Sequence, residues 1–595
     1  MTSSDEDLPP GLRSMWRVCR LGYSNEPRLL VAAFSLTVLG AVPDALLALW
    51  LQLLGRGVVE RDRALLLAAC LGLGLSATGT WFLRVVSSRV TRRFRDRVTI
   101  ALESHVARLQ ASVPTVAHQE RPLLLDRLAV LRDQIYVLDH MYMSLFSTVG
   151  WVLRLGITVA LLVSIHPALV LLAVFALPTV VTSTWRPGVE RAVQEQAAPH
   201  MRLAKHLFQT ATTAPPGKEV RVTGIGRRLA AQRREAWERG YRPMARARTV
   251  TAAWHSLAWA AFGSAYVAAV VLVATVLDAG AGSVLLVLAA GARLSAYIGA
   301  TVAEVGWLRG IWLDGSRRLV WLEEYAAALV VDADQDPPAR LERGVRFEHV
   351  SFSYPGTDRL VLDDVTLDLP AGSVVAVVGE NGAGKSTLVK LLCKLYAPDS
   401  GRILVDDVPL DAIRTDGWRA RLAGAFQDFF RFELRADHSV GLGDVPRVDD
   451  RPSVVAAVDR AGAGDVVERL ADGLDTQLGP TWPGGVEVSF GQWQKLALAR
   501  GFMREMPLVL VLDEPTAALD AETEHALFER YAAAAGGTDG RITLLVSHRF
   551  STVRMADLIV VLDGARVVET GSHADLMSRG GPYSELYGIQ AEAYR

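Results

Sequence analysis

Nine consecutive residues, GENGAGKST at 379–387, have the types and spacing of a loop that holds a chain of phosphates. The apolar run SVVAVV precedes them and TLVKLLCKLY continues from them, so we expect a strand, the loop and a helix in that order. Glycine lets backbone N–H groups curl around phosphate oxygens, the Lys385 ammonium would reach the β- and γ-phosphates, and the Ser386 hydroxyl would bind Mg²⁺. The predicted nucleotide contacts of this phosphate loop are Gly379, Glu380, Asn381, Gly382, Ala383, Gly384, Lys385, Ser386 and Thr387.

Two carboxylates end a second apolar run, LVLVLDEP at 508–515. In a protein with a phosphate loop this pattern places Asp513 toward Mg²⁺ and Glu514 near the γ-phosphate of ATP, where Glu514 would polarise the attacking water. His548 follows the strand-like run ITLLVS and would reach the same phosphate, because ligands of open α/β sheets bind at the carboxyl ends of strands. An isolated histidine is more often structural, so His548 depends on the other motifs.

The elements that must position these residues divide the chain in two. Residues 345–595 alternate short Val- and Leu-rich runs with glycine turns, which is typical of a soluble α/β domain. Residues 1 to about 330 hold long apolar runs separated by arginine-rich segments, and an acidic, proline-containing linker joins the halves. The net charge of −1 averages the halves and indicates no partner, and three scattered cysteines predict neither a disulfide framework nor a metal site.

Six segments are long and apolar enough to cross a bilayer, which takes about 20 residues. The segment from Ser87 to Tyr136 carries nine Arg and the segment from Arg186 to Arg248 carries fourteen Arg or Lys, so both are expected to face the cytosol, with both termini. We expect the helices to continue well past the bilayer and return; the alternative is soluble domains inserted between spans. Residues 10–24 predict an amphipathic helix on the membrane surface. The spans are 29–54, 63–86, 138–165, 167–186, 250–277 and 283–308.

Three charged residues, Asp44, Arg154 and Arg293, lie inside the apolar spans, where charge is costly. Counting 1.5 Å per residue from the outer helix ends puts all three at a depth of roughly 15 Å, so they are able to share a layer. Two interpretations stay open: an ion pair that fixes helix packing, and a polar patch that faces a transported substrate. Glu304 lies on nearly the same helix face as Arg293, near the cytosolic boundary.

The order of these motifs resembles that of ATP-binding-cassette (ABC) transporters. It comprises Tyr354, the phosphate loop, FQDFFRF (426–432), VSFGQWQ (488–494), LVLVLDEPTAALD (508–520) and SHR (547–549). The chain resembles an exporter-type half-transporter over residues 10–590, similar to actinobacterial-style peptide and natural-product exporters without a peptidase domain. The resemblance implies a six-span α-helical membrane domain with long cytosolic extensions, followed by an α/β P-loop ABC nucleotide-binding domain. The expected division is 1–28 (N-terminus with surface helix), 29–330 (membrane domain), 331–344 (linker) and 345–595 (nucleotide-binding domain).

The resemblance also assigns roles by matching position. Tyr354 would stack on adenine, and Gln427 would sense the γ-phosphate, contact the metal and couple to the membrane helices. Asp520 would communicate across a dimer of cassettes. The loops 118–131 and 215–226 resemble those that dock onto cassettes. The signature segment, 488–492, would cap the ATP held by the opposite cassette through Ser489, Gly491 and Gln492.

Phe490 departs from the family pattern LSGGQ, in which glycine stands at this position. Its Cβ and ring restrict φ and are able to hold the backbone back from the phosphate, and loss of one preorganised donor would slow catalysis on the order of 10²–10³-fold. The residues that serve the chain's own ATP are intact. The chain is therefore expected either in a heterodimer with a partner that has a sound signature, or in a homodimer in which Phe490 turns outward.

The expected function is ATP-driven export of a small molecule, peptide or lipid across the cell membrane by a dimer, with ATP hydrolysed at sites shared between the two cassettes. The first alternative is an importer on the exporter architecture, as in siderophore-type uptake. The second is a soluble cassette ATPase acting on ribosomes or DNA, which the six spans oppose, so we expect no nucleic-acid partner. The cargo itself is not predicted.

Overall fold

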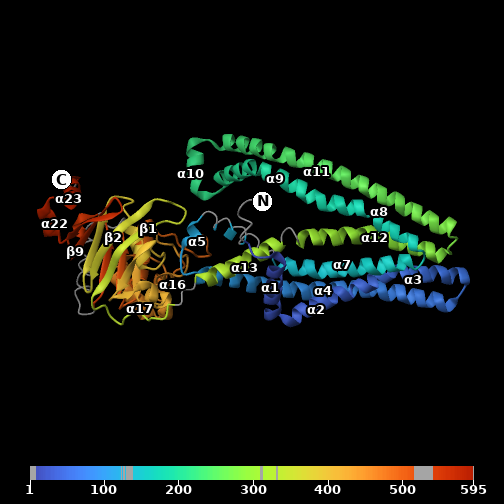
Figure 1. Ribbon diagram of the computed structural model, residues 1–595, viewed down its shortest axis with the longest axis horizontal. Helices are drawn as coiled ribbons and strands as arrows, with labels where there is room; N and C mark the ends of the chain where they lie inside the picture. Colours follow the sequence, from blue (N-terminus) through green and yellow to red (C-terminus); the bar gives the residue numbers. More distant parts are fainter. Residues whose placement is uncertain are drawn as a thin grey trace. The chain divides into compact units, whose positions relative to one another are not determined.

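The computed structural model describes residues 8–121, 124, 127–128, 131, 138–308, 312–329, 333–514, 540–547 and 549–593. They belong to two compact units, which are coloured by sequence in Figure 1. The helical unit comprises Met1–Gln110 and Asp126–Glu324, and the cassette unit comprises Ala111–Leu125 and Tyr325–Arg595. A short piece of the first arginine-rich segment, Ala111–Leu125, thus belongs with the cassette; we name it the docking segment.

The helical unit contains six helical stretches long and apolar enough to span a membrane, within the part of the chain that the structure describes. The chain is a multi-pass membrane protein, as the six apolar runs predicted. Its helices are α1 (Gly11–Asn25), α2 (Pro27–Leu39), α3 (Ala41–Glu60), α4 (Arg63–Ser112), α7 (Asp139–Val163), η2 (Pro167–Val170), α8 (Leu171–Phe175), α9 (Leu177–Thr212), α10 (Ala214–Thr223), α11 (Gly226–Val271), η3 (Leu272–Val276), α12 (Ala281–Trp307) and α13 (Leu313–Ala328).

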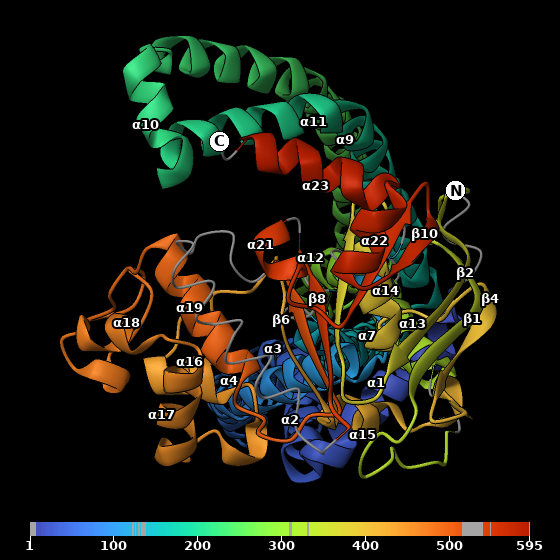
Figure 2. The ribbon, with the colours of Figure 1, turned by 90° about the vertical axis from the view of Figure 1, so that its left-hand side faces the viewer.

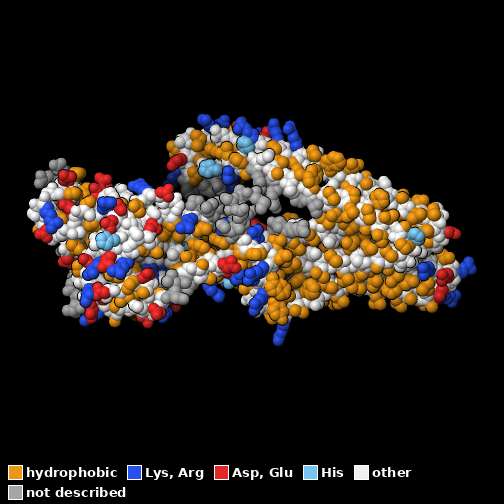
Figure 3. All heavy atoms as spheres, in the orientation of Figure 1, with side chains coloured by type: hydrophobic (Ala, Val, Ile, Leu, Met, Phe, Trp, Pro, Cys, Tyr) orange, Lys and Arg blue, Asp and Glu red, His pale blue; other side chains and the backbone are white. Residues whose placement is uncertain are grey.

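The predicted extension of the helices beyond the bilayer is confirmed. With 50 residues, α4 is about 75 Å long, more than twice the apolar thickness of a bilayer of about 30 Å. Figure 3 shows hydrophobic side chains covering the bundle around α3, α7 and α12, whereas Lys and Arg gather over the end that carries α10. Close packing of α3 on α12 depends on two glycines, because a Cβ on Gly55 would lie 2.8 Å from the Cα of Gly282.

The amphipathic helix α1 packs inside the helical unit on one face and leaves apolar side chains exposed on another. The Tyr142 hydroxyl of α7 donates to the Val18 carbonyl at 2.6 Å, and Arg17 forms ion pairs with Glu323 and Glu324. Trp16 remains largely exposed. An exposed aromatic ring on such a helix is what binding to a membrane surface requires.

The cassette unit is built on two sheets. The six-stranded sheet has the order β10-β9-β3-β8-β7-β6, parallel except for β10, and the four-stranded antiparallel sheet has the order β2-β1-β4-β5. The strands are β1 (Gly344–Ser353), β2 (Leu360–Pro370), β3 (Val374–Gly379), β4 (Ser400–Val405), β5 (Val408–Pro409), β6 (Leu422–Ala425), β7 (Val509–Asp513), β8 (Ile542–Val546), β9 (Leu558–Asp563) and β10 (Arg566–Gly571). The helices are α5 (Ala117–Glu120), α14 (Lys385–Leu392), η5 (Leu410–Ala412), α15 (Thr415–Ala420), α16 (Ala436–Gly441), η6 (Val445–Arg447), α17 (Arg451–Arg460), α18 (Gly464–Glu468), η7 (Gly473–Asp475), α19 (Phe490–Gly501), α21 (Phe550–Val553), α22 (His573–Arg579) and α23 (Pro582–Ala593).

Buried strands such as β3 are apolar at every position because both faces of the sheet are covered. Val375 and Val377 face a core shared with β1, β2 and α14, whereas Ala376 and Val378 face a core shared with α16, α17 and α19. Figure 2 shows α16–α19 grouped on one side of the sheet and β1, β2 and β4 on the other. In the parallel register Asp513 lies opposite Val546, so the carboxyl ends of β7 and β8 finish at one edge.

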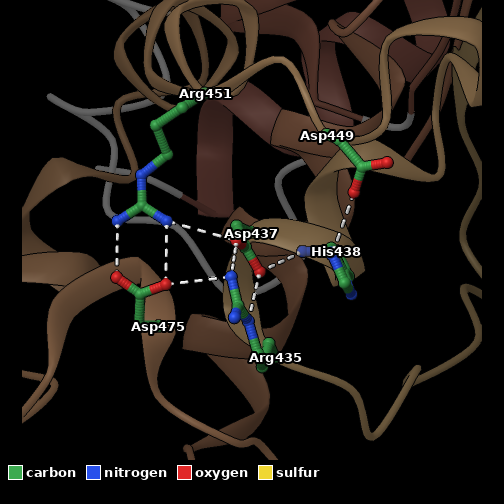
Figure 4. Close-up of polar contacts among 6 residues, drawn as sticks. All are labelled: Arg435, Asp437, His438, Asp449, Arg451 and Asp475. Atoms are coloured by element: carbon green, nitrogen blue, oxygen red, sulfur yellow. Dashed lines mark hydrogen bonds and ion pairs between the residues drawn. The ribbon is translucent and has the colours of Figure 1, made fainter.

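A ring of charges ties the helical part of the cassette together (Figure 4). Arg435 and Arg451 each form ion pairs with both Asp437 and Asp475, and the Arg451–Asp475 contact is 3.1 Å. Burial acts to raise the pKa of Asp437, but its hydrogen bonds with Arg435 and the His438 N–H outweigh this and lower it. The ring therefore anchors the start of α16 to α17 and η7.

Candidate nucleotide site

The phosphate loop has the geometry that its glycines predict. It leaves β3 and enters α14, and Gly379, Gly382 and Gly384 have φ values of 149°, 86° and 104°. These conformations favour glycine, and a Cβ on Gly384 would in addition lie 2.6 Å from the Val361 carbonyl oxygen. The loop therefore turns its backbone in the way that lets successive N–H groups converge on an anion.

Lys385 is buried, and its Nζ donates to the carbonyls of Gly379 and Glu380, both at 2.9 Å. Burial lowers the pKa of the Lys385 ammonium, while Glu514 and Asp513 act to raise it. The ammonium is thus held across the mouth of the loop by neutral acceptors that phosphate oxygens are able to replace.

The two carboxylates at the end of β7 have different surroundings. Asp513 is buried, which raises the pKa of its carboxyl to about 6, although a hydrogen bond with Ser386 acts to lower it. Its Oδ1 is buried with no hydrogen-bond partner among the described residues. An oxygen of this kind beside a serine hydroxyl suits a hard divalent cation, so the donor set fits Mg²⁺. Glu514 has a φ of 46°, rare outside glycine, and its N–H donates to Val546 at 2.9 Å.

A pocket of about 820 Å³ brings residues from four parts of the sequence together. The phosphate loop meets Tyr354, Gln427 and Glu514 there, although these lie far apart in the chain. Asp513 lies in an adjoining cavity that also reaches Ser386 and Gln427. The first pocket is lined by Tyr354, Thr357, Arg359, Val361, Asn381, Gly382, Gly384, Lys385, Ser386, Thr387, Gln427 and Glu514. Gly379, Glu380 and Ala383 belong to the same loop but do not line the pocket.

The signature segment forms a complete helix cap. Ser489 precedes α19, its Oγ accepts from the Gln492 N–H at 3.3 Å, and the Gln492 Oε1 accepts from the Ser489 N–H at 2.8 Å. Phe490 is the first residue of the helix, so its backbone needs no glycine. Its half-exposed ring lies 5.4 Å from that of Phe429 and beneath the Arg431 guanidinium.

The docking segment supplies contacts that sequence patterns did not specify residue by residue. The Val116 N–H donates to the Leu395 carbonyl at 3.3 Å, and Glu120 forms an ion pair with Lys390 at 3.2 Å and accepts from the Tyr396 hydroxyl. The predicted docking loop 118–131 thus meets the cassette at its start. The second predicted docking loop, 215–226, forms α10 and the turn after it, in the helical unit.

The charged residues of the membrane spans share one layer, as their counted depth predicted. Asp44 accepts from the Arg154 Nε at 2.9 Å, from the Arg293 Nη1 at 3.0 Å and from the Tyr297 hydroxyl at 3.1 Å. The Arg154 guanidinium also lies 4.6 Å from the ring centre of Trp151. One carboxylate therefore joins α3 to α7 and α12 and leaves the cluster with a surplus positive charge. Glu304, farther along α12, accepts from the Ser144 hydroxyl.

Two predicted site residues, Asp520 and His548, lie outside the described residues. Gly491 and Gln492 lie in the first turn of α19, and Thr387 binds the Tyr354 hydroxyl at 3.0 Å. The sequence analysis assigned no role at the site to Lys390 and Tyr396, which follow Thr387 by three and nine residues. Only the fold reveals that they lie beside Tyr354.

Together the fold and site define a phosphate-loop nucleotide-binding cassette joined to a six-span helical bundle. Residues 362–517 match the family described as ABC transporter. Across 96% of this chain and 99% of the other, the fold is shared with a solved bacterial Atm1-family ABC exporter with ATP bound, at a TM-score of 0.71 and 24% identity. The chain therefore carries an ABC transporter domain, which is an ATP-binding domain, and has the fold of an exporter half-transporter.

Curated relatives include proteins named ATP-dependent lipid A-core flippase. The one from Thiobacillus denitrificans is 38% identical over 280 residues, which is 46% of this chain and 47% of the relative. The one from Pseudomonas fluorescens is 39% identical over 262 residues, or 44% and 42%. The chain thus matches about half the length of these relatives.

Proposed function

We propose that the protein is an ATP-driven exporter that works as a dimer and hydrolyses ATP where two cassettes meet. One observation carries the proposal: a single pocket gathers the phosphate loop, Tyr354, Gln427 and Glu514 in a chain that also has six apolar spans. Such a pocket joined to membrane helices suits coupling between nucleotide and transport. A ligand shifts a conformational equilibrium only by its differential affinity for the two states, and ATP clamped between cassettes favours the closed one.

Each residue then has a role in the proposed reaction. Lys385 and the loop N–H groups hold the β- and γ-phosphates, Tyr354 stacks on adenine, and Gln427 senses the γ-phosphate. Glu514 orients the attacking water and accepts its proton. Ser386 and Asp513, with Gln427, would hold Mg²⁺, which offsets phosphate charge when bound.

The remaining assignments complete the proposal. His548 would contact the γ-phosphate, and Asp520 would communicate across the dimer. Ser489, Gly491 and Gln492 would cap the nucleotide held by the second copy, because a helix N-terminus attracts anions. The proposal includes the division of the chain into an N-terminal part (1–28), a membrane domain (29–330), a linker (331–344) and a nucleotide-binding domain (345–595).

We further propose that the protein lies in the plasma membrane with the cassette and both termini in the cytosol, since the arginine-rich segments favour that side. The cargo class is a lipid, a peptide or another small amphipathic molecule; the flippase relatives support a lipid. The alternative is import by a protein with the exporter architecture. ATP-dependent transport into inside-out vesicles would indicate export, whereas uptake by whole cells would indicate import.

The proposal is tested by Glu514→Gln in lipid nanodiscs. Without the carboxylate, water is not activated, so ATP should stay bound, the dimer should remain closed and ATP turnover should fall at least 10²-fold. Glu585→Gln, an exposed change in the same cassette, is the matched control and should keep turnover. Near-normal ATPase in Glu514→Gln would refute the assignment.

A further inference from the structure

Tyr354 lies in a small aromatic cluster at the end of β1. Its ring centre is 5.2 Å from that of Phe352 and 5.5 Å from that of Tyr396, with both partners edge-on. Phe352 and Tyr396 are buried, and they contact each other at 5.4 Å. Tyr354 is only partly buried and lines the nucleotide pocket, so the cluster fixes the ring from behind.

Lys390 connects this cluster to the docking segment. Its Nζ lies 5.2 Å from the ring centre of Tyr354 and 5.9 Å from that of Tyr396, within the range of cation–π attraction. The same Nζ is 3.2 Å from Glu120 Oε1, while the Tyr396 hydroxyl donates to the other oxygen of Glu120. One carboxylate of the docking segment thus holds two of the side chains that contact Tyr354.

The charges of these groups agree with the geometry. Burial acts to lower the pKa of Lys390, but Tyr354 and Glu120 outweigh it and raise the pKa, so the ammonium stays charged. Burial, and then the hydrogen bond to Glu120, raises the pKa of the Tyr396 hydroxyl, so it stays a donor.

We propose that Glu120 is a positioning residue for the adenine base. It holds Lys390 and Tyr396 in place, and these fix the ring of Tyr354 on which adenine stacks. Adenine binding and attachment of the docking segment therefore strengthen each other by the same factor, as linkage requires. This inference rests on the proposed function, because it takes Tyr354 as the base contact.

A purely structural ion pair would behave differently. Glu120 and Lys390 side chains are 43% and 30% exposed, and pairs of this kind contribute little to stability. Their removal should leave the fold intact and change only how firmly Tyr354 holds a base. Glu120 also lines the cavity that reaches Ser386 and Asp513, but its two carboxylate oxygens contact Lys390 and Tyr396.

The test is equilibrium binding of ATP and of inorganic tripolyphosphate, which lacks a base, to the full chain in nanodiscs. Glu120→Gln should weaken ATP binding about 5-fold, the low end of allosteric couplings, and leave tripolyphosphate binding unchanged. In a Tyr354→Ala background, Glu120→Gln should cause no further loss. Glu238→Gln, which removes an exposed ion-paired glutamate of α11, is the control and should bind like wild type.

Equal weakening of both ligands, or additive losses in the double variant, would overturn the inference. A wild-type chain that binds neither ligand would instead overturn the proposed function. Thermal unfolding of Glu120→Gln should match that of wild type, and a drop of several degrees would assign Glu120 a structural role.

Discussion

At the scale of the residue, Phe490 shows how a departure from a family pattern is accommodated. The residue begins α19, a position with ordinary helical φ, and its neighbours Ser489 and Gln492 complete the cap around it. The ring, 51% exposed, turns toward Phe429 and Arg431. The expectation that Cβ restricts the backbone here has no support in the helix geometry, and the outward orientation was the alternative consistent with a homodimer.

Phe490→Gly should therefore weaken the protein rather than repair it. Glycine loses the ring contacts and is a poor helix former, so the free energy of unfolding should fall by about 1–2 kcal/mol. ATP turnover should change only a few-fold. Thermal unfolding and steady-state ATPase measure the two effects, with Phe490→Leu as the variant that keeps a helix-forming side chain. A 10²-fold rise in turnover would show that the ring obstructs the phosphate.

Asp513 makes the stability of the cassette depend on pH when no metal or nucleotide is bound. Its pKa is raised from the usual value near 3.9 to about 6, so ionisation destabilises the folded state increasingly as pH rises from 4 to 6. Asp513→Asn should then stabilise the chain in EDTA, by about 1 kcal/mol more at pH 8 than at pH 5. Thermal unfolding at both values measures this.

Asp563→Asn provides the control, because Asp563 is exposed at the end of β9 and should show no such gain. A destabilised Asp513→Asn at pH 8 would mean that the hydrogen bond with Ser386 outweighs burial of the carboxylate.

Residue spacing predicted the backbone geometry of the phosphate loop because such a loop is a local structure. The glycines, Lys385 and Ser386 are consecutive, so spacing alone sets their arrangement. The direction of the Phe490 ring and the contact of Glu120 with Lys390 depend on partners far along the chain, and no local pattern carries that information.

At the scale of the element, regular helix geometry explains why the charges of the spans could be aligned in advance. A fixed rise per residue converts sequence position into depth, which placed Asp44, Arg154 and Arg293 together. It does not give rotation about the helix axis, so the sharing of one carboxylate and the fourth member, Tyr297, were not predicted. The contacts favour the role in helix packing.

Asp44→Asn should leave two arginines without a counter-charge near the middle of the membrane span. The free energy of unfolding should fall by about 3 kcal/mol, because breaking a buried ion pair leaves the other charge buried and uncompensated. Arg293, with 40% of its side chain exposed, should matter less than Arg154. Thermal unfolding in detergent measures both. The control is Asp278→Asn, at an exposed positive-φ turn that asparagine tolerates.

A double variant distinguishes a role in helix packing from a role in cargo binding. If the cluster only packs helices, Asp44→Asn combined with Arg154→Gln should be less destabilised than the sum of the single changes. Additive losses, with cargo-stimulated ATPase abolished in each, would point instead to contact with a transported molecule.

At the scale of the whole molecule, the two halves read from composition correspond to the two units, except that the docking segment leaves the first half to join the cassette. Composition could not predict this, because the short segment carries one Glu and one Arg among uncharged residues, a mixture compatible with either half. A local pattern records what a segment is made of, and the fold determines which core it covers.

We propose a homodimer, because the cap at Phe490 is undistorted and the heterodimer interpretation assumed a damaged signature segment. We expect the chain purified alone to form a stable dimer with substrate-stimulated ATPase, measured by light scattering and phosphate release in nanodiscs. Ser489→Ala, which removes the cap acceptor, should lower turnover without changing dimer mass. A chain that stays inactive until a second, different subunit is added would establish the heterodimer.

The docking segment also bears on how the ATPase is studied in isolation. Val116 and Ala117 pack on the core of the cassette, and Arg419 donates to the Pro114 carbonyl. A soluble fragment that begins at the interdomain linker would lack the docking segment. Its loss would expose apolar surface of the cassette and remove Glu120, the ion-pair partner of Lys390. A separately expressed cassette should therefore carry residues 111–125 on a flexible linker before its nucleotide preference is compared with that of the full chain.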